Sequence, residues 1–444
     1  MSKTRIPVQR LGKLKSTALP WALGVLVLGQ SLLPGLLQAG AEQTELAELI
    51  VAAQSNNPSI TAATAQQQVK VEQARQAGAW ADPELMVKIQ NGLIDDPFSF
   101  TSDSATAKVI GLSQKLPFYG KRALARQEAE VAARAAQWQT VERQNELARM
   151  VKAAWYQLYL VDRSLESTGK NIDTIDNLSR LSETMYGIGK AGQQEVLRVQ
   201  LERSQLANLE IDLQQQRASQ VAALNSMAYR PLATAIPSIP VTTTSKITIS
   251  ATELLALAET HRPALHFLKT ELERLTLGQQ LAEKEVLPDF NLALEYMQLE
   301  PTAQSAGDDM YSVELSFNLP LNHDRRAAML AETGAAYRQT AANLADIQNQ
   351  ISLAIQESLI QLDSSHRRAE LYLQGLLPQA EKALESALAA YQTDTATFTE
   401  VLEREVALIG LENEYHQAVS QFQIRLAILE EVIGTDLPAR STQP

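Results

Sequence analysis

Residues 186–197, YGIGKAGQQEVL, recur 205 positions further along the chain as residues 391–402, YQTDTATFTEVL. Both segments begin with tyrosine and end with the triplet Glu-Val-Leu. The residues around each segment have apolar side chains at three- and four-residue spacing, which is typical of helices. The glycines at 187, 189 and 192 interrupt that spacing and indicate a chain reversal. Each segment is therefore predicted to be the turn of a helical hairpin.

The same offset aligns much of the rest of the chain with itself. Its matches fall in the same order in both halves: Glu48 with Glu253, Leu49 with Leu254, Ala53 with Ala258, Pro58 with Pro263, Pro83 with Pro288, and Leu206 with Leu411. Chance explains one or two such matches but not an ordered series. The sequence therefore predicts a tandem duplication.

The N-terminus has the pattern of a secretory signal peptide. Five basic residues precede an apolar run over residues 21–37, and Ala39-Gly40-Ala41 supplies small residues at a cleavage site. An uncleaved membrane anchor is the alternative, but glycine and proline interrupt a run that is short for a span. We therefore expect residues 1–41 to be removed, so that the mature chain begins at Glu42.

The duplication and the signal peptide together predict the domain organisation. We expect a signal peptide over 1–41, a first repeat over 42–235, a linker over 236–250, a second repeat over 251–435 and a disordered C-terminal tail over 436–444. Removal of the signal peptide changes the formal charge from −12 to −17. Nucleic acid is therefore not an expected partner. The absence of cysteine excludes disulfides, a thiol nucleophile and a lipid-anchored N-terminal Cys.

Each half is predicted to have the same order of elements. A helix broken near its start by proline comes first, over 45–76 and 252–285. Two short segments follow, in which apolar and polar residues alternate. A very long helix comes next, over 121–185 and 325–390, with Gly169 as a possible break in the first copy and Gly334, Gly375 and Pro378 in the second. At roughly 1.5 Å per residue it approaches 100 Å. A return helix ends each half, near residues 227 and 433.

The alternating segments predict strands with one apolar and one polar face. In the second half Phe290, Leu292, Leu294 and Tyr296 share one face, and Tyr311, Val313, Leu315 and Phe317 share one face of the next segment. A half-buried soluble sheet gives the same pattern as a strand pair in a membrane. No apolar run of transmembrane-helix length follows Ala41, so we expect any membrane insertion to use strands. Four strands cannot close a barrel with a lumen, so several chains would have to share one.

The sequence offers few candidates for chemistry. The histidines at 261, 266, 323, 366 and 416 are scattered, and only the first two lie close together. The methionines are dispersed as well, and no serine, histidine and aspartate grouping stands out. We therefore predict no enzyme activity, no cofactor and no metal site.

The order of signal peptide, helix, strand hairpin and long helical hairpin, repeated twice, resembles the TolC-type outer-membrane efflux channel family. The specific matches are residues 114–122, QKLPFYGKR, and the two reversals at 186–197 and 391–402. The Pro-x-x-Gly-Lys-Arg form of the first segment is similar to the heavy-metal pump branch of the family. The strand-to-helix junctions that carry this resemblance contain Pro117, Gly120 and Pro320.

The resemblance implies a mainly α fold with a small β part, assembled as a homotrimer whose twelve strands form one barrel continued by a helical barrel. It implies a passive efflux duct in the outer membrane that extends into the periplasm. The implied partners are outer-membrane lipid, a periplasmic adaptor (membrane fusion) protein and an inner-membrane pump of the resistance-nodulation-division type. The exported substrate stays open among metal cations, drugs and polypeptides.

The resemblance also implies site residues. The adaptor would meet the reversals, which contain Gly187, Gly189, Lys190, Thr393, Asp394 and Thr395. Glu400 and Glu403 match positions at which the family presents acidic side chains to the pore constriction. Acidic residues in a first helical turn also simply stabilise the helix. The second reversal departs from the first, with Asp394 where the first has Gly189.

Two other classes of protein fit part of the pattern. A soluble periplasmic adaptor has a helical hairpin, but a single one flanked by small β domains. A soluble coiled-coil structural protein lacks the signal peptide and the strands. The two copies of a strand pair followed by a helical hairpin argue against both.

Overall fold

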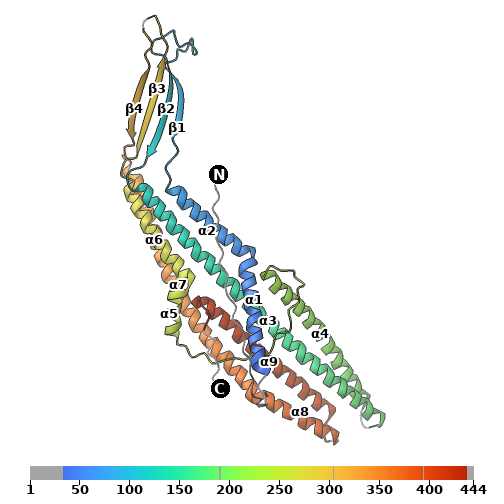
Figure 1. The fold of residues 1–444 in the computed structure, drawn as a ribbon. Coiled ribbons are helices and arrows are strands. Elements are labelled where there is room, and N and C mark those ends of the chain that lie inside the picture. The colour runs from blue at the N-terminus through green and yellow to red at the C-terminus, as the bar shows by residue number, and fades with distance from the viewer. Residues whose placement is uncertain (1–33, 190–191, 304, 394, 438–444) are drawn as a thin grey trace, which may run out of the picture.

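A computed structural model describes residues 34–189, 192–303, 305–393 and 395–437 of the chain. Most of the expected signal peptide and of the C-terminal tail lies outside these residues. The chain is elongated, with a sheet at one end and two helical hairpins whose tips lie at the other end (Figure 1). The predicted mainly α fold with a small β part is confirmed.

The first repeat opens with two helices, α1 (Pro34–Asn56) and α2 (Pro58–Ala77). Pro58 lies in the first turn of α2. Backbone N–H groups in a first turn have no acceptor within the helix, so the missing N–H of proline costs no hydrogen bond there. The side chain of Asn57 caps this turn by accepting a hydrogen bond from the Ser59 backbone N–H at 2.9 Å. The predicted break at Pro58 is therefore correct, although α1 begins before residue 45.

The long helical hairpin of the first repeat consists of α3 (Lys121–Gly187) and α4 (Gln193–Met227). Helix α3 has 67 residues, so it is about 100 Å long. Gly169 lies within it without interrupting it. A helix of this length is stabilised by packing along its sides, and α3 contacts α2, α4, α6 and α9.

The second repeat has the same order with one more interruption. Its helical elements are α5 (Ala251–His261), α6 (Pro263–Lys284), α7 (His323–Leu371), the π-helical turn η1 (Tyr372–Leu376), α8 (Leu377–Gln392) and α9 (Phe398–Ile433). The predicted break near Gly375 and Pro378 is this π turn, in which the Leu377 N–H donates to the carbonyl of Tyr372, five residues back. The wider turn admits Pro378, which cannot continue the α-helical bonding pattern. Gly334 causes no break.

All four strands lie in one antiparallel sheet. They are β1 (Glu84–Gln90), β2 (Ala107–Leu116), β3 (Phe290–Leu299) and β4 (Met310–Phe317), in that spatial order. The pairing of β2 with β3 joins the two repeats, with Ile110 opposite Tyr296 and Leu112 opposite Leu294. Strands β1 and β4 are the edges of the sheet within the chain.

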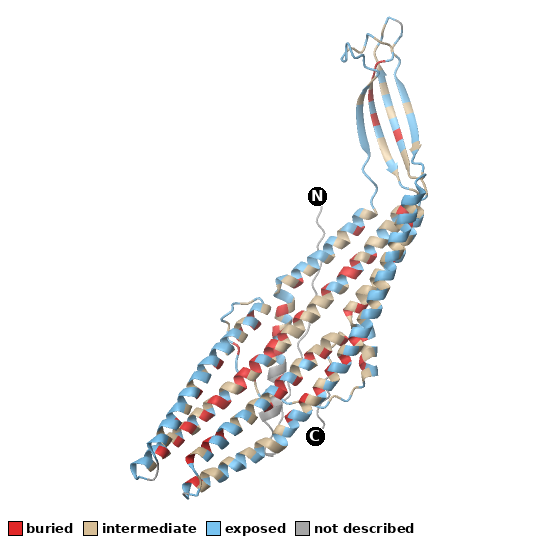
Figure 2. Ribbon diagram, turned by 180° about the vertical axis from the view of Figure 1, so that it is seen from behind, coloured by how far each residue is buried: buried red, intermediate tan, exposed pale blue. Residues whose placement is uncertain are grey.

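The buried residues concentrate where the helices face one another, while the sheet is mostly exposed (Figure 2). A first apolar cluster joins α1, α3, α4 and α9 around Trp155, Leu158 and Tyr159. A second joins α5, α6, α7 and α9 around Leu254, Ile355 and Phe422. The core is therefore helical, and no apolar layer formed by the described residues packs on the faces of the sheet.

The segment between the repeats, residues 236–250, forms neither helix nor strand. Ile236 and Ile239 are nonetheless buried in the first apolar cluster. Asp162 of α3 accepts a hydrogen bond from the Ile239 N–H at 2.9 Å and pairs with Arg217 of α4 at 2.7 Å. This segment is therefore bound to the first helical hairpin rather than free in solution.

Candidate functional site: the sheet face, the helical tips and the α3–α9 interface

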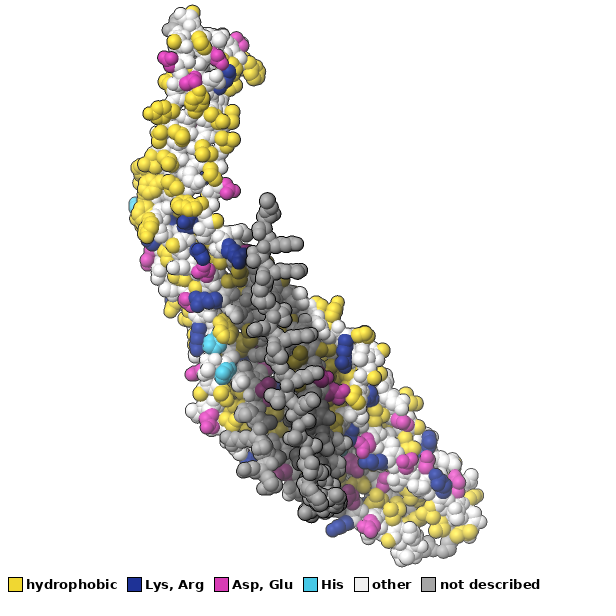
Figure 3. Space-filling view, viewed as in Figure 1, with side chains coloured by type: hydrophobic (Ala, Val, Ile, Leu, Met, Phe, Trp, Pro, Cys, Tyr) yellow, Lys and Arg dark blue, Asp and Glu magenta, His cyan; other side chains and the backbone are white. Residues whose placement is uncertain are grey.

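One face of the sheet is apolar and exposed. The cross-strand register places like side chains in rows, such as Leu85 beside Leu112, Leu294 and Val313. Each of these four side chains is exposed, and apolar side chains cover the sheet in Figure 3. Soluble monomers rarely expose a contiguous apolar face of this kind, which instead marks an interaction with lipid or protein.

The opposite face carries the polar side chains. Lys88 of β1 and Glu295 of β3 form an ion pair at 2.9 Å across this face. Beside them lie small or polar residues, including Gly111, Ser312 and Ser316. The predicted division into two faces is clear in β3 and β4, but it is mixed in β2, where Lys108 lies on the apolar face and Val109 on the polar face.

The strand-to-helix junctions meet at Asp289, which precedes β3. Its carboxylate accepts a hydrogen bond from the Phe118 N–H at 2.8 Å and pairs with Lys121 at 3.1 Å. Its own N–H donates to the side chain of Asn318 at 2.6 Å. Asp289 thus ties the end of β2 and the end of β4 to the start of β3. Sequence reasoning missed it because it lies outside the repeated junction segments.

Gly120 and Pro320 have different roles in the two junctions. Gly120 caps α3 with a φ of +88°, which favours glycine. In the second copy Asn322 caps α7, and its side chain accepts from the Arg325 N–H at 3.0 Å. Pro117 and Pro320 lie in the short connections after β2 and β4, where a strand must end.

Both predicted reversals form the tips of helical hairpins. Gly189 in the first tip has a φ of +74°, and Lys190 next to it lies outside the described residues. In the second tip Thr393 and Thr395 both donate from their hydroxyls to the carbonyl of Ala390, at 3.1 and 3.0 Å. Asp394 also lies outside the described residues, so its comparison with Gly189 stays a prediction.

The two tips are held together by apolar side chains. The third buried cluster contains Ile175, Leu178, Val199, Leu206, Tyr391, Phe398, Val401 and Leu402. These residues come from α3, α4, α8 and α9, so the cluster joins the first hairpin to the second. The separation of the tips therefore requires exposure of this cluster.

Glu400 and Glu403 both lie exposed at the start of α9. Glu400 forms a capping box with Thr397, in which its carboxylate accepts from the Thr397 N–H at 3.0 Å. This contact stabilises the first turn of the helix. The exposed carboxylate of Glu403 has no hydrogen bond or ion pair with the residues that the structure describes. The predicted role of the pair at a pore constriction stays a prediction.

The structure adds a third acidic residue on α9 that the sequence reasoning missed. Glu405 is only 3% exposed and lies in the interface between α9 and α3. It accepts a hydrogen bond from Thr174 of α3, and burial raises the pKa of its carboxyl. An acidic residue among apolar positions at helical spacing was the available signal, because Glu405 lies four residues after Val401 on the same face.

A polar row continues along this interface toward the sheet. Ser167 of α3 bonds to Glu412 of α9 at 2.5 Å, and the hydroxyl of Tyr159 bonds to Nδ1 of His416 at 3.0 Å. Burial, with the nearby positive charge of Arg163, lowers the pKa of His416 to about 4. His416 is therefore a neutral hydrogen-bonding residue at physiological pH.

No group of three or more His, Cys, Asp or Glu residues in the described parts of the chain could hold a metal ion. His266 instead stacks on Trp138, with ring centroids 4.4 Å apart. None of the helices in the described ranges is both long and apolar enough to cross a bilayer.

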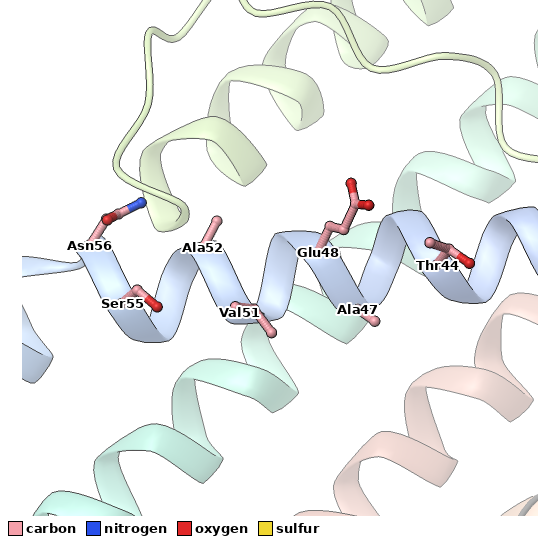
Figure 4. A pocket seen from close by; sticks show the side chains of 7 residues that line it. All are labelled: Thr44, Ala47, Glu48, Val51, Ala52, Ser55 and Asn56. Atoms are coloured by element: carbon pink, nitrogen blue, oxygen red, sulfur yellow. The ribbon is translucent and has the colours of Figure 1, made fainter. Parts of the chain in front are cut away.

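A hollow of about 720 Å³ lies along α1. The described residues that line it all come from that one helix, and Glu48 and Val51 point to opposite sides of it (Figure 4). Polar groups do not converge there, so it carries no chemistry that we can assign.

Comparison with known proteins finds a family match over the first repeat of the chain. Residues 49–228 match the profile of a family described as outer membrane efflux protein. No curated protein sequence matches the chain. This partial match agrees with the sequence resemblance to efflux channels, whereas the heavy-metal branch stays a prediction.

Several solved structures share the fold at low sequence identity. The outer membrane protein VceC of Vibrio cholerae has 20% identity and a TM-score of 0.74, over 88% of this chain and 96% of that one. A membrane protein of Pseudomonas aeruginosa has 17% identity and a TM-score of 0.74, over 88% and 93%. The MtrE outer membrane channel of Neisseria gonorrhoeae, in an open state, has 15% identity and a TM-score of 0.71, over 90% and 91%.

Proposed function

We propose that this chain, a member of the outer membrane efflux protein family through residues 49–228, is the outer-membrane channel subunit of a tripartite efflux pump. The single observation that carries the proposal is the sheet, whose exposed apolar face continues across both repeats and adjoins a helix of about 100 Å. Lipid would cover the apolar face, and the helices would extend into the periplasm.

The assembly we propose is a homotrimer. Strands β1 and β4 leave unpaired backbone groups at the edges of the sheet, which is costly in lipid. Pairing β1 of one copy with β4 of the next removes both edges. Three copies would close a barrel of twelve strands, with the polar face around Lys88 and Glu295 directed to its lumen. The helices of three copies would continue the duct.

The proposed protein partners meet the far end of the helices. An adaptor protein of the periplasm would contact the tips at Gly187, Gly189 and Lys190 and at Thr393, Asp394 and Thr395. An inner-membrane pump of the resistance-nodulation-division type would lie beneath. The support for this arrangement is that the tips lie opposite the sheet (Figure 1).

The proposed cargo is small solutes or metal cations. Three copies would bring three pairs of Glu400 and Glu403 to the periplasmic entrance. A ring of carboxylates in a narrow passage concentrates cations and repels anions. The duct itself would be passive, so that its specificity would come largely from the pump.

A soluble periplasmic adaptor or structural protein is the alternative class. Fractionation of cells and electrophoresis with and without heating separate the two. We expect the protein in the outer-membrane fraction. Before heating, it should migrate on the gel faster than the heated chain or as an oligomer. In planar bilayers it should give stepwise conductance. Recovery of all the protein in the soluble periplasmic fraction would overturn the proposal.

A further inference from the structure

Glu405 is a buried carboxyl group for which the described residues supply no cationic partner. Its side chain is 3% exposed, and its Oε2 has no hydrogen-bond partner among the described residues. Among the described residues, the group receives a hydrogen bond from Thr174 on α3, whose hydroxyl also lies 3.1 Å from the carbonyl oxygen of Lys170. An ionised carboxylate in such a place loses its hydration without compensation, which strongly disfavours the ionised form.

The charged groups around Glu405 do not offset this loss. Glu412, on the same helix, adds a like charge that opposes ionisation. On α3, Lys170 pairs with Glu166 at 2.9 Å. The remaining charged groups of the neighbouring helices are engaged or exposed: Asp176 pairs with Arg203 of α4 at 3.2 Å, and Asp173, Glu381, Lys382, Glu385, Glu403 and Arg404 are directed at least partly to solvent.

The position of Glu405 connects it to the tips. It lies one turn after Val401 of the apolar cluster that joins the two hairpins, and it faces Thr174 beside Ile175 of the same cluster. Glu403, two residues earlier, is exposed on another side of α9. A charge at residue 405 would therefore act on the contact between α9 and α3, whereas a charge at residue 403 acts on the solvent side.

We propose that Glu405 is a proton-sensitive positioning residue, which holds α9 and its tip against α3 when neutral and loosens this contact when ionised. The regulatory meaning rests on the proposed channel function, because the tips would then form the periplasmic entrance. The contact between the helices can be tested without it.

The direction of the pH effect follows from the environment of the group. Burial raises the pKa of Glu405 above the ordinary carboxyl value of 4.5. The favourable contribution of the neutral form is therefore complete below that ordinary value, and it is lost as the pH rises through the raised pKa. His416, further along the interface, acts in the opposite direction, since its neutral form is the one that is buried.

The experiment measures the distance between the two tips directly. The chain has no cysteine, so Thr184→Cys on α3 and Gln392→Cys on α8 provide unique, exposed positions for spin labels. Labelled chains are diluted with unlabelled ones, and pulsed electron paramagnetic resonance is recorded between pH 4.5 and 8.5. All labelled proteins also carry His416→Gln, which removes the group whose pH effect opposes that of Glu405. In this background we expect a short distance in acid and an increasing long-distance fraction as the pH rises.

Three variants test the assignment to Glu405. Glu405→Gln keeps the shape and a hydrogen-bond acceptor for Thr174 but cannot ionise, so the pH response should be lost. Glu385→Gln, at an exposed position on α8, should keep it. Thr174→Val removes the hydroxyl that favours the ionised form, so the midpoint should move to higher pH, which also provides a test if Glu405→Gln fails to fold.

The outcomes separate this proposal from the channel function. An unchanged pH response in Glu405→Gln would overturn the role of Glu405. The absence of a pH response in the labelled protein that retains Glu405 would also overturn it. If Glu405→Gln does not fold, an unmoved midpoint in Thr174→Val would overturn it as well. A pH response that depends on Glu405 in a protein without bilayer conductance would retain this proposal and remove the proposed function instead.

Discussion

Arg198 of α4 donates a hydrogen bond from Nη1 to the hydroxyl of Thr399 on α9, across 3.1 Å. The bond joins the second turn of α4 to the first turn of α9, so it links the two return helices, one from each repeat. It is exposed to solvent, so water competes for both groups and the net contribution should be below about 1 kcal/mol. The buried side chains of Val401 and Leu402 beside it should contribute more to the closed arrangement of the tips.

This difference predicts unequal effects of two substitutions. Arg198→Ala should broaden the distribution of distances between labels at Thr184 and Gln392 while the fold stays intact. Leu402→Ala should destabilise the tip region by roughly 2–5 kcal/mol, because it opens a cavity in the apolar cluster. Hydrogen exchange of α4 and α9 measures the second effect. Equal loss of protection in both variants would contradict this ranking.

The sequence predicted the large elements of this fold because they follow from strong periodic patterns. The 3.6-residue period over residues 121–185 continues long enough to exclude other structures, and α3 ends two residues beyond the predicted range. The π turn at Tyr372–Leu376 could be predicted only as a break, since Gly375 and Pro378 indicate an interruption without specifying the bonding that results.

The buried polar contacts could not be predicted in the same way. Whether Glu405 faces solvent or α3 depends on the rotation of two helices about their axes, which a single-helix pattern does not determine. The contact of Asp289 with the N–H of Phe118 joins residues 171 positions apart. Such contacts depend on the arrangement of the repeats in space, which the sequence pattern alone leaves open.

The two faces of the sheet predict opposite tolerance to charge at adjacent positions. Leu315→Arg on the apolar face should weaken assembly by roughly 2–4 kcal/mol if it lies near the bilayer midplane, because an arginine would enter lipid. Glu314→Arg, one residue earlier and on the other face, should be tolerated. The yield of folded oligomer in outer membranes measures both, and a similar loss in the two variants would reject the assignment of the faces.

The acidic residues at the start of α9 predict a change in ion selectivity. Glu400→Gln and Glu403→Gln together should reduce cation selectivity in planar bilayers, since they remove the proposed ring of carboxylates. Of the single variants, Glu403→Gln should have the larger effect, because the carboxylate of Glu400 is engaged with the Thr397 N–H.

Glu195 provides the matched control for this experiment. It occupies the equivalent position in the first repeat, at the start of α4, and Glu195→Gln should leave the selectivity unchanged. If the double variant at residues 400 and 403 keeps the original selectivity, then both residues act as helix stabilisers and the constriction lies elsewhere.

The buried imidazole of His416 predicts an acid-sensitive contact between α3 and α9. Its pKa falls from the ordinary 6.5 to about 4, chiefly because burial disfavours the charged form. The unfolded chain therefore binds a proton that the folded chain rejects between these two values. The stabilising contribution is complete above pH 6.5 and is lost as the pH falls toward 4. Its upper limit is about 3 kcal/mol, at roughly 1.4 kcal/mol for each pH unit.

Replacement of this imidazole should remove most of that acid sensitivity. His416→Gln keeps a polar partner for Tyr159, whose hydroxyl bonds to Nδ1, but it cannot be protonated. Hydrogen exchange of α3 and α9, corrected for the intrinsic rate, should therefore depend less on pH between 6.5 and 4 than in the unsubstituted protein. His323→Gln at the exposed start of α7 should keep the original dependence. If His416→Gln loses as much protection as the unsubstituted protein when the pH falls from 6.5 to 4, then other groups of the interface, such as Glu412, control its response to acid.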